Sequence, residues 1–310
     1  SLELCSHPKP TPHHMRRQLF VPGNPEGQLS LYGGSRIGLP SLLLRLIIIG
    51  FMFCLTSHDA VGQDVAPASE FKPPVTRWWL NTYANIQLSD RFFWVAQTHL
   101  RRTESPAMNF AGRWAQVYNR HALSYLVNDH FSVSLGGVLR INFNGEVDEQ
   151  DERRTVPEWR IWHEYLRSQH FWRGKVYHRV RLEHRWTRGY ETDATWNFRN
   201  RWRYMMAVKQ PINRKHLEVG AFYFGPEVEL IMQSGKSVVG NPLEDLRLHA
   251  SFGYIASTQV RFAVGMMYSF GQLPYDPGLY KQNLTLRTHI YYTPDWRATK
   301  RKLPAIHLRE

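Results

Sequence analysis

Cysteine is scarce in this sequence, and most of the chain has none. The 310 residues include two cysteines, Cys5 and Cys54, and both precede the part that we interpret as the mature protein. Disulfides and thiolate chemistry are therefore excluded from that part. We also find no phosphate-binding glycine loop, no zinc-type ligand spacing and no nucleotide-binding fingerprint. These patterns predict no cofactor, no metal ligand and no catalytic residue.

Acidic residues are also few relative to basic ones. The chain has 26 Asp and Glu against 39 Lys and Arg, which gives a formal net charge of +13. Such a charge admits nucleic acid, anionic lipid or another polyanion as a partner and does not distinguish among them. Aromatic residues, in contrast, are abundant at 14%. Membrane β-barrels combine many apolar and polar side chains, because lipid-facing and lumen-facing residues alternate along each strand.

One apolar run near the N-terminus is too short to cross a bilayer. Leu46–Leu55 comprises ten residues, whereas a transmembrane helix needs roughly twenty. Arg36 and Arg45 precede the run, and Ala60-Val61-Gly62 offers small residues for cleavage before Gln63. This order is typical of a cleavable secretory signal peptide.

Two other interpretations of this region are a membrane anchor and a lipoprotein signal. The run is short for an anchor, and a lipoprotein signal at Cys54 would have the bulky Phe53 where a small residue is preferred. Residues 1–35 are rich in Pro, His and Gly without a repeat, which is typical of an over-extended translation start or a disordered segment. We expect a leader over 1–62, a linker over 63–76, a β-barrel over 77–295 and a basic C-terminal tail over 296–310.

From about residue 77 the sequence alternates apolar and polar side chains with a period of two, which indicates β-strands. In 130–143, Phe131, Val133 and Leu135 share one face while Ser132 and Ser134 share the other. These segments match the length of a tilted membrane strand, about nine to eleven residues, better than the five or six of a globular one. We expect strands near 77–88, 92–102, 113–126, 130–143, 158–168, 175–187, 197–209, 215–229, 244–255, 259–271 and 283–293.

The connections between these segments alternate in length. Short ones at 89–91, 128–129, 210–213 and 257–258 exchange with long polar ones at 103–112, 144–157, 188–196, 230–243 and 272–282. The sequence therefore predicts an all-β fold, an antiparallel transmembrane β-barrel of about 10–12 strands in the bacterial outer membrane, with short periplasmic turns and long extracellular loops. Bacterial single-chain barrels have even strand numbers. We therefore expect twelve strands, with the one not recognised near 64–76 or within 230–243. The alternative is that two of the segments form a single strand.

Charged side chains share the polar face of three consecutive predicted strands. Because the apolar faces should meet lipid, these charges should point into the lumen. They are Glu158, Arg160 and Glu164 in the first strand, Arg179, Arg181, Glu183 and Arg185 in the second, and Arg199, Arg201 and Arg203 in the third. Neighbours on one face stand about 7 Å apart, where two cations repel by roughly 2 kcal/mol at an effective dielectric of about 20. Cross-strand pairing with the glutamates, and with Glu218, can offset this repulsion.

This charged lumen has two interpretations. A salt-bridge network would fill a narrow barrel and hold it closed, which gives an outer-membrane protein with a structural role. Excess positive charge in the lumen would instead favour anions, as rings of Arg or Lys do in anion-selective pores. Arg247, His249, Arg261, Arg287 and His289 add to that excess. The expected partners are outer-membrane lipid and small anions, and no protein partner is indicated.

Three stretches carry a resemblance to a known family: P-E-W-R-I-W-H-E-Y (157–165), R-V-R-L-E-H-R-W (179–186) and F-R-N-R-W-R-Y (198–204). They resemble an uncharacterised family of bacterial outer-membrane barrels, classified only as a domain of unknown function. Its most specific mark is a strand of the form R-x-R-x-E-x-R. The resemblance covers about residues 70–295 and does not include the leader. It implies a barrel fold and outer-membrane placement, and it assigns no catalytic residue.

Other classes of function are less well supported. An outer-membrane lipid-modifying enzyme could use His249 and Ser251, which share a face, but no base and orienting group mark an activated nucleophile. A nucleic-acid-binding protein could use interleaved Arg and Trp. The signal peptide and the outward apolar faces argue against that class, so nucleic acid is not an expected partner. A soluble ligand carrier is a further class. Such a protein would stay in solution without detergent, whereas a membrane barrel would not.

Removal of the leader is testable. Because an exported protein loses its signal peptide, protein from the outer-membrane fraction should begin at Gln63. N-terminal sequencing of that material measures the cleavage site. Recovery of the intact chain in the cytosol would contradict export.

Overall fold

The computed structural model describes residues 70–145, 153–238, 241–273 and 276–297. All the regular secondary structure in these residues is β-strand. The strands are β1 (Glu70–Phe71), β2 (Val75–Gln87), β3 (Phe92–Ser105), β4 (Met108–Asn128), β5 (Phe131–Phe143), β6 (Thr155–Phe171), β7 (Gly174–Thr187), β8 (Asn197–Pro211), β9 (Phe222–Ser234), β10 (Leu243–Ile255), β11 (Val260–Leu273) and β12 (Asp276–Tyr292). Within these residues no helix is long and apolar enough to cross a membrane. The predicted leader, with its apolar run and cleavage site, and the tail from residue 298 lie outside the described residues.

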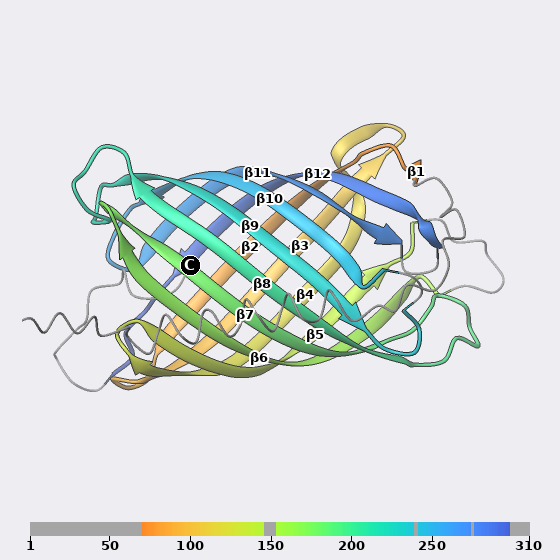
Figure 1. Ribbon diagram of the computed structural model, residues 1–310, viewed down its shortest axis with the longest axis horizontal. Helices are drawn as coiled ribbons and strands as arrows, with labels where there is room; N and C mark the ends of the chain where they lie inside the picture. Colours follow the sequence, from red (N-terminus) through yellow and green to blue (C-terminus); the bar gives the residue numbers. More distant parts are fainter. Residues whose placement is uncertain (1–69, 146–152, 239–240, 274–275, 298–310) are drawn as a thin grey trace, which may run out of the picture. The chain divides into compact units, whose positions relative to one another are not determined.

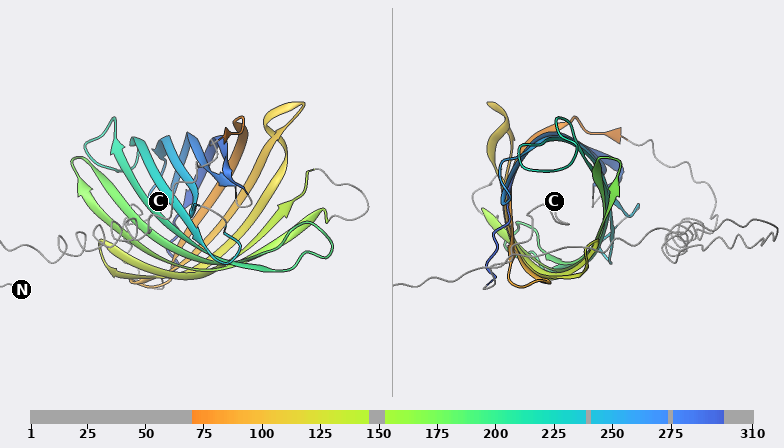
Figure 2. Two further views of the ribbon diagram at one scale, coloured as in Figure 1. Left: turned by 45° about the vertical axis from the view of Figure 1, so that its right-hand side comes forward. Right: turned by 90° about the vertical axis from the view of Figure 1, so that its left-hand side faces the viewer.

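Eleven strands, β2 to β12, close an all-β barrel (Figure 1). Each pairs antiparallel with the next, and β12 returns to pair with β2. Seen along its axis in the right panel of Figure 2, the sheet forms a ring. The predicted all-β barrel and its approximate size are therefore confirmed.

The closing pair of the barrel is parallel, not antiparallel. Strand direction reverses at every connection, so the first and last of an odd number of strands run the same way. Accordingly Asn283 pairs with Val75, and Tyr292 with Ala84, in a parallel ladder. Such a ladder also satisfies the backbone hydrogen-bonding groups, so closure does not require an even number of strands.

The prediction of a twelfth strand in the barrel wall is wrong. Within the predicted linker, β1 does pair with β12, but it lies ahead of β2 along the same edge: Glu70 pairs with Leu279 and Phe71 with Tyr280. Lys72-Pro73-Pro74 separates β1 from β2, and proline cannot donate to the ladder. β1 therefore extends the seam without adding to the circumference.

The two rims of the barrel carry different connections. Long connections at 144–154, 188–196 and 235–242 share the rim at which β2 begins, which we call the long-connection rim. The opposite rim carries the short turns 88–91, 129–130, 172–173 and 256–259, together with one connection as long as those of the first rim, 212–221. Two connections predicted to be long, 103–112 and 272–282, belong mostly to strands: only 106–107 separate β3 from β4, and β11 ends at Leu273 while β12 begins at Asp276.

The connection 212–221 is longer than the predicted turn at 210–213, and the strand predicted from 215 begins only at Phe222. Local hydrogen bonds account for the difference. Asn213 accepts a hydrogen bond from the backbone N–H of Phe222 at 2.7 Å and donates one to the carbonyl of Gly220 at 3.0 Å. Gly220 has a φ of 83°, in the left-handed region that glycine tolerates best. Leu217 and Val219 continue the apolar–polar alternation of a strand in the sequence, but they lie in this connection and not in β9.

Side chains alternate between an apolar outer face and a mixed inner face. Leu135 and Phe252 are each 62% exposed on the outside. The interior contains small apolar clusters, such as that of Leu166, Tyr177 and Met205, near the opposite rim. The charged residues singled out in the sequence on β6, β7 and β8 occupy the middle of the barrel and the half towards the long-connection rim, whereas Lys209 and Arg261 are buried near the opposite rim.

Gly136 and Gly137 provide a matched test of strand packing. A Cβ at Gly136 would lie 2.1 Å from the carbonyl oxygen of His121 on β4, whereas one at Gly137 would lie 3.7 Å from its nearest neighbour, a backbone oxygen. We expect Gly136→Ala to lower the free energy of unfolding by about 1–3 kcal/mol, because backbone must shift to make room. Gly137→Ala should leave it nearly unchanged. Urea unfolding in lipid vesicles, followed by tryptophan fluorescence, measures both, and equal effects would contradict the packing described.

Candidate functional site: the charged lumen

The ten charged residues singled out in the sequence lie on the inner faces of β6, β7 and β8. Glu158 is 0% exposed and Glu183 is 1% exposed, while Trp159 and Ile161, on the outer face of β6, are 51% and 52% exposed. The strand period of two separates the two sets, because successive side chains of a strand point to opposite faces. The structure also brings these charges together with further acids from other strands.

Glu158 binds arginines from three strands. Its carboxylate lies 2.6 Å from the guanidinium of Arg140 on β5, 2.6 Å from that of Arg160 on its own strand and 2.9 Å from that of Arg185 on β7. A buried carboxylate with three cationic partners has most of its hydrogen-bonding capacity satisfied.

Glu183 is the second centre of the network. It accepts hydrogen bonds from Arg160 at 2.7 Å, Arg203 at 2.9 Å and Arg201 at 3.3 Å. Because Arg160 also binds Glu158, the two glutamates belong to one connected set. Loss of either carboxylate would leave several buried guanidinium groups with fewer counter-charges.

Four acids on β9 and β10 extend the pairing and were not predicted. Glu229 binds Arg203, Arg179 and Arg247 at 2.7, 2.8 and 3.1 Å. Glu244 binds Arg201 and lies 3.3 Å from Arg185. Glu227 lies 3.1 Å from Arg287, and Asp245 lies 2.7 Å from Arg247.

The acid that the sequence suggested for this role, Glu218, is not part of the network. It lies exposed in the connection 212–221. The partners on β9 could have been found from the sequence. Glu227 and Glu229 share one face, and the alternation continues through Ile231 to Ser234, where β9 ends.

Contacts across the barrel tie the network to the other side of the wall. The guanidinium of Arg247 on β10 lies 5.4 Å from the ring centre of Trp79 on β2, and that of Arg101 on β3 lies 3.6 Å from the same ring. The ammonium of Lys209 on β8 lies 5.3 Å from the ring of Tyr291 on β12. The contacts of Arg247 with Trp79 and of Lys209 with Tyr291 join strands that are not neighbours, so side chains span the lumen.

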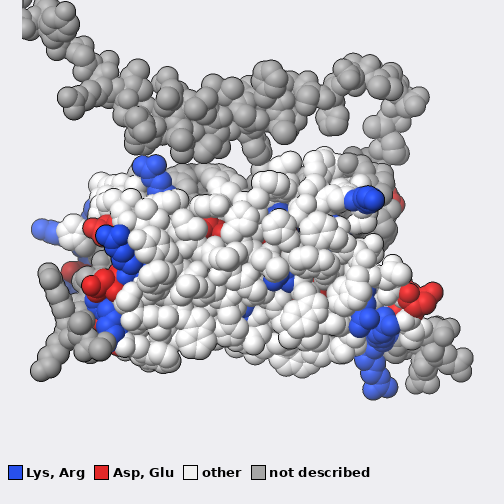
Figure 3. Space-filling model, turned by 90° about the horizontal axis from the view of Figure 1, so that it is seen from below, with Lys and Arg blue, Asp and Glu red and all other residues white. Residues whose placement is uncertain are grey.

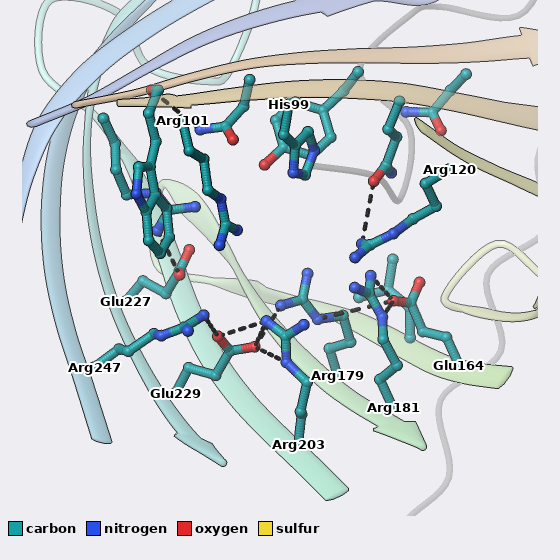
Figure 4. Close-up of a pocket in the computed structure, with 17 residues that line it drawn as sticks. His99, Arg101, Arg120, Glu164, Arg179, Arg181, Arg203, Glu227, Glu229 and Arg247 are labelled. Atoms are coloured by element: carbon teal, nitrogen blue, oxygen red, sulfur yellow. Dashed lines mark hydrogen bonds and ion pairs between the residues drawn. The ribbon is translucent and has the colours of Figure 1, made fainter. Parts of the chain in front are cut away.

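A cavity that we call the central chamber lies inside the barrel (Figure 4). Its lining includes seven arginines, Arg101 and Arg120 among them, but only three glutamates, Glu164, Glu227 and Glu229. The space open to the centres of water molecules is about 70 Å³. Positive charge therefore exceeds negative charge around the chamber.

Histidines and a serine occupy the lumen near β10 and β12, but their geometry does not form a nucleophilic site. The hydroxyl of Ser251 donates to the carbonyl of Gly225 at 3.1 Å. Nδ1 of His249 lies 3.9 Å from Glu227, and its ring centre lies 5.7 Å from that of His289. No serine–histidine hydrogen bond is formed here in the described part of the barrel, so Ser251 has no base to activate it. In the same residues no cluster of His, Cys, Asp and Glu is placed to hold a metal ion.

Comparison with known proteins gives one match. The model of a family described as "Protein of unknown function (DUF2490)" matches residues 76–277, which include the charged strands β6, β7 and β8. Neither the curated proteins nor the solved structures that were compared with the chain gave a match.

Glu183→Gln tests the energetic role of the network. Removing this charge leaves Arg160, Arg201 and Arg203 short of a buried partner, so we expect a loss of about 3–5 kcal/mol in the free energy of unfolding. Glu191→Gln, at an exposed position in the connection 188–196, is the control and should change it by less than about 0.5 kcal/mol. Chemical unfolding in vesicles measures both variants. Similar small effects would show that the lumenal ion pairs do not hold the barrel together.

Proposed function

We propose that this chain, which belongs to the DUF2490 family, is an outer-membrane β-barrel whose lumen is filled and closed by its own charged side chains. It acts as a structural barrel that presents its three long connections on the cell surface. The short turns of the opposite rim, together with the connection 212–221, then face the periplasm.

The outer face supports membrane insertion. Large apolar side chains are exposed on strands around the wall. Leu123 on β4, Trp202 on β8 and Phe262 on β11 are 53%, 50% and 45% exposed. On the face seen in Figure 3, charged side chains gather towards the two ends, and the middle is mostly uncharged. The wall strands have 13 to 21 residues, such as the 13 of β5 and the 21 of β4. That is enough for the roughly nine to eleven residues of a tilted membrane crossing.

Closure of the lumen rests on one observation: the ion pairs form a continuous network from Arg140 on β5 to Asp245 on β10. Its links run through Glu158, Arg160 and Glu183, and then through Arg203, Glu229 and Arg247. An open pore needs a continuous water-filled path. A cavity of about 470 Å³ is bounded by Arg140 and Glu158 of the network, whereas the central chamber offers only about 70 Å³ to water centres. A network of this kind supports a plugged barrel.

An anion-favouring pore is the second candidate. Arg199 on β8 binds only neutral oxygens among the described residues, Gln233 at 3.5 Å and Thr187 at 3.3 Å. Together with the excess of arginine around the central chamber, this leaves the lumen positive. A pore of this kind would require the network to open.

Planar bilayer recording separates the two candidates. The purified barrel should show no steady conductance, because the network blocks the lumen, and Arg201→Glu should be equally silent. Heat-modifiable migration in gel electrophoresis is the control that each sample is folded. A stable conductance with anion preference in a salt gradient, weakened or reversed in Arg201→Glu, would refute the closed barrel and favour the pore.

A further inference from the structure

The central chamber has two unlike walls. On β6 to β10 its arginines are paired: Arg181 with Glu164, and Arg203 and Arg247 with Glu229. On β3 and β4 the arginines meet only neutral partners. In Figure 4, Arg101 and Arg120 extend from this second wall towards the ion pairs of the first.

The neutral partners of Arg101 and Arg120 are uncharged oxygens and aromatic rings. Arg101 donates to the hydroxyl of Tyr118 at 2.9 Å and to Gln116 at 3.3 Å, and it lies over the ring of Trp79. Arg120, which is 5% exposed, donates to Gln97 at 3.4 Å. No carboxylate among the described residues lies within salt-bridge distance of either guanidinium. A buried cation without a counter-charge is costly. An anion bound at this wall would therefore stabilise Arg101 and Arg120.

Unused polar atoms face the same space. His99 lines the chamber and is 6% exposed, yet neither of its ring nitrogens has a hydrogen-bond partner in the described structure. The Nε atoms of Arg101 and Arg120 are also buried and without an acceptor. Buried polar groups are usually satisfied, and a ligand with several acceptor atoms would satisfy these.

We propose that the central chamber binds a free tetrahedral oxyanion, phosphate or sulfate, held by Arg101 and Arg120 against the paired arginines of the opposite wall. An oxyanion presents several acceptor oxygens to guanidinium groups, which bind such anions with charge-assisted hydrogen bonds. Chloride has one atom and cannot bridge the two walls in the same way.

The size of the chamber limits the ligand. A single water needs about 10–15 Å³ of such space, and the chamber offers about 70 Å³. That corresponds to a handful of waters, or to one phosphate or sulfate. A sugar or a lipid headgroup is too large. The ligand is therefore the free anion, and it would serve as an internal counter-charge for Arg101 and Arg120.

Titration with inorganic phosphate tests this proposal. The folded barrel in neutral detergent is exchanged into chloride buffer and titrated with phosphate at constant ionic strength. Tryptophan fluorescence reports binding, because Trp79 lines the chamber and Trp162 lies under Arg181. We expect a saturable change and a higher unfolding temperature with phosphate or sulfate, and neither with added chloride. Absence of both the phosphate and the sulfate response would overturn the proposal.

Matched variants show whether the chamber is the site. Arg120→Gln should weaken phosphate binding about tenfold or more, the loss expected for one charged hydrogen bond. Arg101→Gln should do the same, so that the test survives if one variant misfolds. Arg199→Gln is the control, because Arg199 also lacks a carboxylate partner among the described residues but does not line the chamber. Equal weakening in all three would indicate unspecific attraction and would overturn the proposal.

This inference is independent of whether the barrel conducts. A silent barrel without a phosphate response refutes the oxyanion site and leaves the closed barrel standing. A conducting barrel with a saturable phosphate response that depends on Arg120 refutes closure and supports the site.

Discussion

The interior of this barrel depends on neutralising arginines that the fold has buried. A guanidinium group remains charged under any ordinary condition, so it cannot escape the cost of burial by losing its proton. The structure shares each carboxylate among several arginines: Glu158, Glu183 and Glu229 each lie between guanidinium groups of different strands. Each such glutamate therefore ties neighbouring strands together through their side chains as well as through the backbone ladder.

Much of this arrangement was predictable because it follows from a local rule. The period of two assigned the inward side chains of β6, β7 and β8, since a strand carries its own alternation whatever surrounds it. The same rule placed Arg247, His249 and Arg287 inside. The family resemblance, carried by those strands, coincides with the match over residues 76–277.

The partners of these residues were less predictable, because pairing across the lumen depends on closure. Arg185 on β7 meets Glu244 on β10, and Arg287 on β12 meets Glu227 on β9. Each pair is three strands apart, so no pattern along one strand or across one hairpin reveals it. The strand number itself is set by the last pairing, between β12 and β2, whose partners are far apart in the sequence. The connection 212–221 was missed for a different reason: the side chain of Asn213 fixes it by hydrogen bonds.

The parallel seam has a consequence for the two ends of the chain. With eleven strands, β2 starts at the long-connection rim and β12 finishes at the opposite one, where Arg297 forms an ion pair with Asp90 of the connection 88–91. If a membrane surrounds this barrel, Glu70 and Arg297 are on different sides of it. The segments that flank the barrel in the sequence would then meet different compartments, with different proteases, partners and ionic conditions. The parity of the strand count decides this, and no single side chain does.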